Sequence, residues 1–304
     1  MLANFRRKLK PWMLPIAMLI GVVLHDYIHY VAFLSKYLIF IMLLITYCRV
    51  KLSDFHVGPY IWCLLAVQIP GALLAYWLLA PFSHELAQGA FICIFCPTAT
   101  AAPVITGMLG GSVPKVATYS LFSHIFVAFL TPVLLSYISP ETDLPFVESV
   151  MTIAQSVLPL ILGPLVLAAL FQRFAPKVHE GIANHQGLSF YIWAVALIIV
   201  VGNSVSFLIR QPADQIPEMI LLAAVSLVAC IGLFWSGRKI GGHFGDKISG
   251  AQSLGQKNTV LAVWLALTYL NPVVSAAPAA YVAWHNTVNS YQIYRKTRGS
   301  AKQN

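Results

Sequence analysis

The sequence predicts an all-α polytopic membrane protein with ten transmembrane helices in two inverted five-helix repeats. Three observations predict this class. Of the 304 residues, 59% are hydrophobic and only 10% are charged, whereas about 25% of the residues of a soluble domain are charged. The apolar residues form ten segments, most of them close to the roughly 20 residues that span a bilayer. The fourth segment of each half is interrupted by polar residues together with proline or glycine.

Short polar connections separate the ten apolar segments. The segments cover approximately residues 12–24, 31–48, 57–80, 88–109, 116–138, 150–172, 187–209, 219–236, 248–270 and 276–294.

The basic residues predict the orientation. With the N-terminus inside, 16 of the 19 Lys and Arg residues fall on the inner side, and seven of the ten Asp and Glu residues fall on the outer side. Such an excess of basic residues is typical of cytoplasmic loops. We therefore expect a multi-pass protein of the plasma membrane or bacterial inner membrane, surrounded by lipid bilayer, with both termini cytoplasmic. The net charge of +9 reflects this topology, so no nucleic-acid partner is expected.

The five cysteines all lie within apolar segments or at their ends. No pair has the spacing of metal ligands on a loop. We therefore expect small buried residues, and neither a disulfide framework nor a metal or other cofactor.

The polar residues and the proline of the first three segments need no functional explanation. Segments one and two are joined at His25, Asp26 and Tyr27, which suit a water-facing edge. Segment three contains Gln68 and Pro70. The proline predicts a kink, and the amide of Gln68 predicts a hydrogen bond to a neighbouring helix more than a ligand contact.

Segment four is predicted to be broken. Residues 96–103 place Pro97 and Pro103 among small residues that include Thr98 and Thr100. Each proline lacks a backbone donor and clashes with the preceding turn. Carbonyl groups freed at membrane depth must be buried by protein or reached by water. The alternative is a kinked helix that its neighbours satisfy, and a second break at Gly255 makes this less attractive.

Segment five carries Ser120 and His124. A histidine inside a span can carry protons, but it is more often a neutral, hydrogen-bonded interior residue. A polar linker at 139–149 then separates a first repeat, residues 1–138, from a second repeat, residues 150–304. Because five is odd, the second repeat must be inverted, and inverted repeats with matching broken helices are typical of secondary transporters.

The second repeat concentrates its polar residues in segment nine, since segments six to eight are plainer. Residues 253–259 form a polar run in the middle of segment nine, and Lys257 lies within it. An ionisable group at that depth costs about 3 kcal/mol unless it is paired or hydrated. Lys257 follows Lys247 by ten residues, about 15 Å of helix, so the alternative of reaching the inner surface needs a long path. In segment ten, His285 and Asn286 predict a hydrogen-bonded strut.

Several stretches resemble the bile acid:sodium symporter family. Residues 96–101, with Cys-Pro and Thr-Ala, are similar to its first helix break, and residues 258–262, with Asn-Thr and Leu-Ala, are similar to its second. Residues 278–286 resemble its final helix, and residues 52–55 resemble one of its loops. The resemblance covers nearly the whole chain. It implies a panel domain of segments one, two, six and seven, and a core domain of segments three to five and eight to ten. It also implies that the broken helices cross in the core, and that sodium drives uptake of organic anions such as sterol conjugates or small carboxylates.

The family's sodium ligands do not carry over to this chain, which looks like a divergent member. The Ser-Asn pair after the first break falls on residues 102–103, an alanine and a proline. The two hydroxyl residues of segment five fall on Val116 and Ser120, so one is lost. The glutamate of the second break falls on Ser253 and its glutamine on Lys257. An ammonium at such a site would repel a bound cation at close range.

The sequence therefore predicts a secondary transporter of a small organic anion, bile-acid-like or carboxylate, that works by alternating access without sodium. Lys257 would replace the cation, held by hydroxyl groups and by carbonyls freed at the crossing. Coupling to protons through Lys257, pairing of Lys257 with the substrate carboxylate, and a pH-independent facilitator or exchanger all remain open. The residues expected at the substrate or ion site are Thr98, Thr100, Ser120, His124, Ser253, Gln256, Lys257, Asn258, Thr259 and Asn286.

Two other classes of function were compared with transport. The main alternative is a membrane sensor or receptor that kept the fold and lost transport. An intramembrane enzyme is not expected, because the spans hold no paired carboxylates or metal-spaced histidines and His124 has no evident nucleophile partner. Nothing in the sequence indicates an oligomeric state.

Overall fold

Every regular element is a helix in the parts of the chain that the computed structural model describes, which are residues 13–49, 57–139, 145–184, 186–210 and 212–301. Three features of the sequence lie outside these ranges. They are the basic residues before the first apolar segment, the 52–55 loop and residues 140–144 of the expected linker.

Four helices are long and apolar enough to cross a membrane in the described part of the chain. They are α5 (Pro59–Leu79), α8 (Val113–Ile138), α9 (Phe146–Phe174) and α12 (Ile216–His243), the last preceded by the 3-10 turn η3 (Ala213–Gln215). Large apolar side chains cover their outer surfaces; Trp77 and Leu78 of α5, for example, are 55% and 62% exposed. Extended exposed apolar surface of this kind suits contact with lipid.

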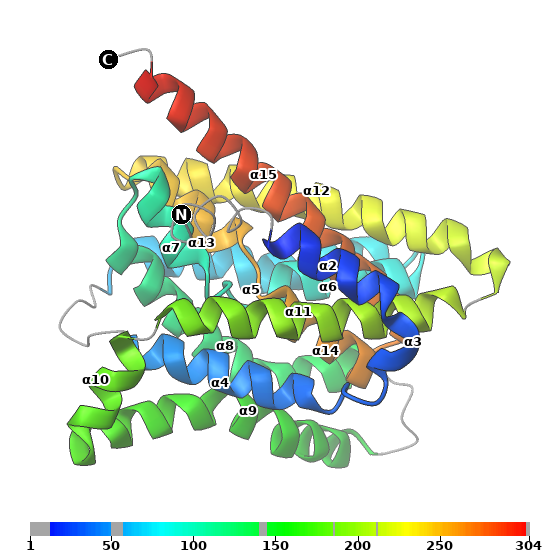
Figure 1. Cartoon of the computed structure of the whole chain (residues 1–304). Helices are drawn as coiled ribbons and strands as arrows, with labels where there is room; N and C mark the ends of the chain where they lie inside the picture. Colours follow the sequence, from blue (N-terminus) through cyan, green and yellow to red (C-terminus); the bar gives the residue numbers. More distant parts are fainter. Residues whose placement is uncertain (1–12, 50–56, 140–144, 185, 211, 302–304) are drawn as a thin grey trace.

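A first helix group consists of α2 (Met13–Val23), α3 (His25–Ile28), α4 (Leu34–Arg49), α9, α10 (Pro176–Asn184) and α11 (Gln186–Ile209). Within this first helix group, α11 packs against α2 and α4, and α4 packs against α9 (Figure 1). The approach of α2 to α11 depends on glycine, since a Cβ at Gly202 would lie 2.8 Å from the carbonyl oxygen of Gly21.

A second helix group consists of α5, α6 (His84–Phe95), α7 (Ala102–Leu109), α8, α12, α13 (Lys247–Gly255), α14 (Thr259–Tyr269), the 3-10 turn η4 (Pro272–Ser275) and α15 (Ala276–Ala301). In this second helix group, α12 packs against α13, α6 and α15, and α5 packs against α6. The backbones of α12 and α13 are in close contact at two glycines. A Cβ at Gly250 would lie 2.1 Å from the carbonyl oxygen of Gly237. Such small residues let helices approach closely in a membrane.

The helices follow the apolar segments closely, and the fourth segment of each half is interrupted as the sequence predicts. α12 and α15 each continue seven residues beyond the apolar segment, to His243 and Ala301. Their last turns carry charged and polar residues, which end an apolar segment without ending a helix. α10 lies in a connection that the apolar pattern does not mark.

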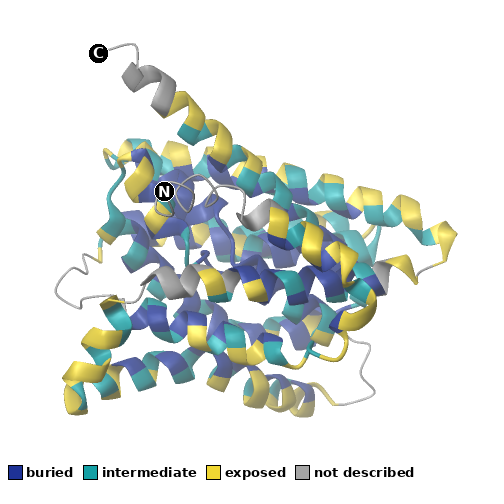
Figure 2. Ribbon diagram, viewed as in Figure 1, coloured by how far each residue is buried: buried dark blue, intermediate teal, exposed yellow. Residues whose placement is uncertain are grey.

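Burial is concentrated where the broken helices meet. Figure 2 shows buried residues in the interior of the bundle, and exposed residues along α10 and the projecting end of α15. Many polar side chains are among the buried residues; Gln68, Thr98, Ser253 and Lys257 are all at most 1% exposed. A buried polar group in an apolar surrounding is costly unless a partner binds it, so the partners of these side chains matter.

Candidate functional site: the crossing of two broken helices

The first break separates α6 from α7. α6 begins after Ser83, whose hydroxyl accepts a hydrogen bond from the backbone of Leu86 at 3.1 Å. It ends at Phe95, because Cys96 takes φ −53° and ψ 146°, the extended conformation favoured before a proline. The helix resumes at Ala102 with a proline in its first turn. The last carbonyls of α6 are therefore left without helical partners.

The second break separates α13 from α14 at residues 256–258. The last residue of α13 is Gly255, where a Cβ would lie 2.4 Å from the ring of Phe234 on α12, so only glycine fits. Asn258 caps α14, and its Oδ1 accepts a hydrogen bond from the backbone of Leu261 at 3.2 Å. This break is shorter than the first and needs no proline.

The two breaks run antiparallel and are joined by a pair of backbone hydrogen bonds. Ala99 donates to the carbonyl of Gln256 at 3.0 Å, and Asn258 donates to the carbonyl of Pro97 at 2.8 Å. These bonds hold the two breaks against each other deep inside the second helix group. They also satisfy backbone groups that neither half-helix can satisfy alone.

Side chains reinforce this crossing. Thr98 and Lys257 lie opposite each other in an isolated antiparallel bridge. The hydroxyl of Thr98 donates to the carbonyl of Ser253 at 2.8 Å, and the hydroxyls of Ser253 and Tyr60 lie 3.4 Å apart. Sequence reasoning selected Thr98, Ser253 and Lys257 as site residues, and the structure brings them together.

The ammonium of Lys257 lies at the C-terminal end of α6. Its Nζ donates to the carbonyl of Ile94 at 2.7 Å and to that of Cys96 at 3.0 Å, and the residue is 1% exposed. The C-terminal end of a helix carries partial negative charge, which favours a cation there. The structure records no bond between this ammonium and the hydroxyls of Thr98, Thr100, Ser120 or Ser253, so its described partners are the freed carbonyls alone.

No described carboxylate forms an ion pair with Lys257; the ion pair recorded among the described residues joins His25 and Asp26. The described residues also include no group of three or more His, Cys, Asp or Glu side chains that could hold a metal ion. The ammonium is therefore bound by neutral oxygen atoms.

Gln68 of α5 also forms hydrogen bonds with the carbonyls at the end of α6. Its Nε2 donates to the carbonyl of Phe95 at 2.7 Å and to that of Cys96 at 3.2 Å. Its Oε1 accepts hydrogen bonds from the hydroxyls of Tyr119 and Ser123 on α8. The sequence identified Gln68 as a helix–helix hydrogen-bonding residue. It gave no link to the break, and it missed Tyr119, whose only signal is a hydroxyl within an apolar segment.

Ser120 and His124 lie on α8 and contact each other. His124 Nδ1 lies 2.7 Å from the carbonyl oxygen of Ser120 and 3.4 Å from its hydroxyl. A carbonyl only accepts, so Nδ1 carries the hydrogen and donates it. The other ring nitrogen is buried and has no partner among the described residues. The ring faces Tyr47 of α4 edge to face, with 6.0 Å between centroids, and neither Ser120 nor His124 bonds to Lys257.

Gln256 begins a row of buried amides that links α13 to α15. Its Nε2 donates to the side chain of Gln252. Gln252 in turn donates to Asn289 at 3.2 Å and to Gln292 at 3.0 Å. Sequence reasoning selected Gln256 but not this row, because the partners come from a helix more than thirty residues farther along the chain.

Two buried polar atoms near the second break have no partner among the described residues, Nδ2 of Asn258 and Nδ1 of His285. Buried polar groups are usually hydrogen-bonded, so these atoms are available to a water molecule or a ligand. Asn286 instead donates to the carbonyl of Val282 in its own helix at 2.8 Å.

The remaining two residues selected from the sequence belong to the breaks themselves. Thr259 is the first residue of α14, and its backbone donates to the carbonyl of Lys257 at 2.9 Å. Thr100 is half-buried in the first break.

Asp246 links the start of α13 to the start of α8, the helix that follows α7. Its Oδ1 accepts from the backbone of Ser249 at 2.9 Å, and its Oδ2 accepts from the backbone of Ser112 at 3.0 Å. One carboxylate thus binds at the start of both α13 and α8. Burial alone would raise the pKa of Asp246, but the hydrogen bonds from Ser249 and Ser112 and the charge of Lys115 outweigh it and lower the pKa.

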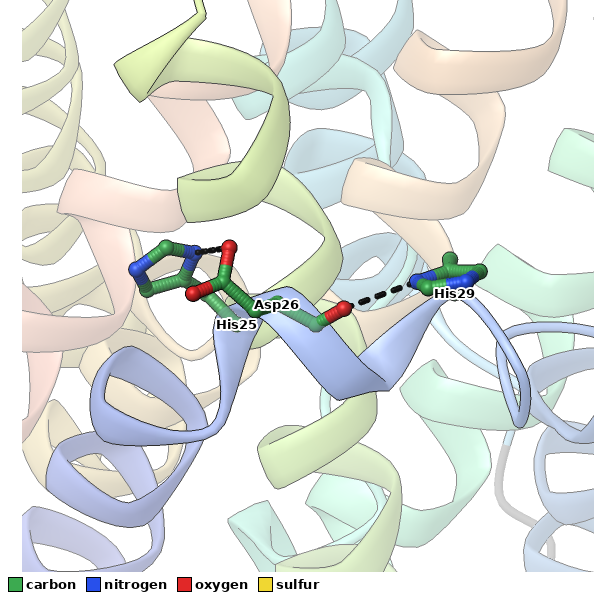
Figure 3. Close-up of polar contacts among 3 residues, drawn as sticks. All are labelled: His25, Asp26 and His29. Atoms are coloured by element: carbon green, nitrogen blue, oxygen red, sulfur yellow. Dashed lines mark hydrogen bonds and ion pairs between the residues drawn. The ribbon is translucent and has the colours of Figure 1, made fainter.

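The polar contacts of α3 form a separate cluster on the short connection between α2 and α4, which Figure 3 shows. His25 Nδ1 lies 3.2 Å from a carboxylate oxygen of Asp26, whose side chain is 71% exposed. His29 donates to the backbone carbonyl of Asp26 at 2.8 Å. The exposed side chain of Asp26 fits the water-facing edge expected from the sequence, and these contacts involve none of the residues of the crossing.

Two comparisons with known proteins show what the chain is similar to. A family model described as "Sodium Bile acid symporter family" matches residues 31–211, which include the first break. The chain is also similar to a protein of Bacillus subtilis (strain 168) named "Uncharacterized sodium-dependent transporter YocS". The two are 24% identical over 243 residues, which cover 76% of this chain and 72% of that protein.

Proposed function

The chain belongs to the sodium bile acid symporter family, and on that basis we propose that it is a secondary transporter of a small organic anion, bile-acid-like or carboxylate, that works by alternating access without sodium. One observation carries the proposal. The ammonium of Lys257 is buried at the crossing and binds the carbonyls of Ile94 and Cys96. A fixed cation therefore lies where the resemblance places a residue of the sodium site.

The donor set at the crossing supports sodium independence, because it does not fit a sodium ion. Hard cations need several oxygen ligands, and carboxylates among them add affinity. Here Lys257 and Gln68 already bind the carbonyls at the end of α6. Ser253 replaces the family's glutamate, and its carbonyl is bound by Thr98. An ammonium at short range would also repel a cation strongly, since little solvent screens it.

We further propose a ten-helix architecture with two inverted repeats, residues 1–138 and 150–304. The paired breaks α6/α7 and α13/α14 support it, because each interrupts the fourth segment of its half. In this proposal the first helix group holds the panel domain, and the second helix group is the core domain, which carries the crossing. Both termini are cytoplasmic, in the plasma membrane or bacterial inner membrane.

The local helix dipoles support the proposal that an anion binds at the crossing. α7 and α14 both begin directly after a break, so their positive N-terminal ends lie at the crossing. The unpartnered Nδ2 of Asn258 adds a buried hydrogen-bond donor. Half-helix N-termini that face an anionic group at the midplane are a recurrent arrangement in secondary transporters.

Proton exchange at Lys257 is the alternative way to drive such a carrier. A protein that binds the anion without moving it, a sensor on the transporter fold, is the alternative in a different class. Thermal unfolding of the detergent-purified protein tests whether an anion binds and whether its binding needs sodium. We expect taurocholate or pyruvate to raise the midpoint, because a ligand of the folded state stabilises it.

The stabilisation should be equal with sodium and with potassium. A requirement for sodium would refute the role of Lys257. Stabilisation by an anion that is never taken up into proteoliposomes would favour the sensor.

A further inference from the structure

The buried ammonium has no fixed counter-charge among the described residues. Lys257 is 1% exposed, and its two recorded partners are neutral carbonyls. The acid that precedes it on the same broken element is Asp246, eleven residues earlier, or about 16 Å of helix. That carboxylate is bound by Ser112 and Ser249. The net positive charge of the crossing is therefore uncompensated when the site is empty.

This charge changes the transport cycle that the proposed function implies. With a monovalent organic anion bound, the ammonium and the anion form a neutral pair. With the site empty, the moving part of the protein carries a positive charge through the apolar part of the bilayer, where charges are strongly disfavoured. A carrier that binds a free cation can release it together with the substrate and return neutral. A carrier whose cation is a lysine side chain keeps the charge unless the ammonium gives up a proton.

We propose that this protein is an anion exchanger, in which a second organic anion must occupy the crossing for the site to return. The inference rests on the proposed function and goes beyond it, since a sodium-independent carrier could also work as a uniporter or a proton symporter. Two features favour the charged form of Lys257 against the cost of its burial. They are the two carbonyl acceptors and the negative end of α6. The substrate class is then a monovalent organic anion on both sides of the membrane.

The size of the effect follows from the energy of a charge at the bilayer centre. That penalty corresponds to about a 100-fold slower return of the empty carrier. One-for-one exchange of monovalent anions also moves no net charge, so a membrane potential should leave its rate unchanged. Return of the empty carrier moves a positive charge and would respond to the potential.

The test uses the full chain in proteoliposomes and radiolabelled pyruvate, with radiolabelled taurocholate as a second probe. The lumen contains either the same unlabelled anion or only a Tris chloride buffer, which holds no organic anion. We expect initial uptake to be about 100-fold faster into anion-loaded vesicles. We also expect the loaded rate to stay unchanged when valinomycin and potassium gradients set the potential.

Lys257→Gln tests the cause. Glutamine keeps a hydrogen-bond donor but removes the charge, so the ratio of uptake into anion-loaded vesicles to uptake into buffer-only vesicles should fall toward one. Lys239→Gln is the matched control, because it removes the same charge from an exposed lysine of α12 beside Trp235. This control should keep the full ratio. If Lys257→Gln does not fold, two wild-type measurements still test the exchange proposal. They are the ratio of the two uptake rates and the independence of the loaded rate from the membrane potential.

Each outcome separates the exchange proposal from the carrier proposal. Equal wild-type uptake into anion-loaded and buffer-only vesicles overturns exchange and leaves the carrier. Uptake into buffer-only vesicles with entry of protons replaces exchange by proton symport. Thermal stabilisation by either anion without any uptake overturns both proposals in favour of a sensor. Neither stabilisation nor uptake with either anion also overturns both.

Discussion

Replacing Gln68 by leucine tests whether the end of α6 is held from two sides. The amide of Gln68 binds the carbonyls of Phe95 and Cys96 and accepts from the hydroxyls of Tyr119 and Ser123. Leucine has a similar size, so the change removes hydrogen bonds with little change in packing. The substitution therefore measures how much this one side chain contributes to the stability of the first break.

The magnitude follows from the groups that lose a recorded partner. In Gln68→Leu, the carbonyl of Phe95 and the hydroxyls of Tyr119 and Ser123 are left without one, whereas Cys96 keeps Lys257. An unsatisfied buried group costs about 1 kcal/mol or more in proteins. Hydrogen bonds between membrane helices average about 0.6 kcal/mol. We therefore expect the free energy of unfolding to fall by about 2–3 kcal/mol.

The assay is equilibrium unfolding in mixed micelles of increasing SDS fraction, and thermal melting provides a second measurement. Gln88→Leu is the matched control, because Gln88 is also fully buried but donates to one carbonyl, that of Ile138, while its Oε1 has no described partner. Its amide nitrogen also lies 3.0 Å from a ring nitrogen of His84. If Gln68→Leu were no more destabilising than Gln88→Leu, the amide would not be a principal support of the break.

Three further predictions concern the crossing, the packing of α12 against α13, and the start of α13. Thr98→Val removes the hydroxyl bond to the second break and should destabilise by about 1 kcal/mol, with Thr98→Ser near wild type in the same SDS titration. Gly250→Leu should lower the yield of monodisperse protein in size-exclusion chromatography, because a side chain there meets the backbone of Gly237, whereas Gly232→Ala meets nothing within 4 Å and should not. The folded-state pKa of Asp246 is lowered, so its stabilisation is present above the ordinary value of 3.8 and is lost as the pH falls through and below it. Asp246→Asn should therefore lower the melting temperature at neutral pH and flatten its fall in acid, and an unchanged acid profile would contradict this.

The sequence predicted the broken elements well because their signals are local. Pro97 alone ends α6 at a position that can be read from the chain, since a proline cannot continue the hydrogen bonding of a helix. Lys257 stood out because a charge in the middle of an apolar segment is expensive. Neither inference needs knowledge of which helices are neighbours.

The partners of these residues could not be predicted, because they come from distant parts of the chain. Gln68 reaches the end of α6 across 27 residues, and Lys257 reaches the same place across 161 residues or more. The expected hydroxyl ligands of Lys257 were chosen by residue type. In the structure, carbonyls bind its ammonium, and a carbonyl is present at every position and carries no sequence signal. The link that Asp246 makes between α13 and α8 could not be predicted for the same reason, since its partner at the start of α8 is the backbone of Ser112.

The position of the ammonium also bears on the choice between a cation substitute and a direct substrate ligand. Two of its three hydrogens are directed to carbonyls at the negative end of α6. The positive helix ends that suit an anion belong to α7 and α14, on the other sides of the two breaks. In the proposed carrier, a lysine bound in this way takes the role of a coordinated ion, and the anion is expected at the backbone donors of the two half-helices and at Asn258. The two sites are then coupled through charge, which is why removing the charge of Lys257 should change the obligation to exchange as well as the affinity for the anion.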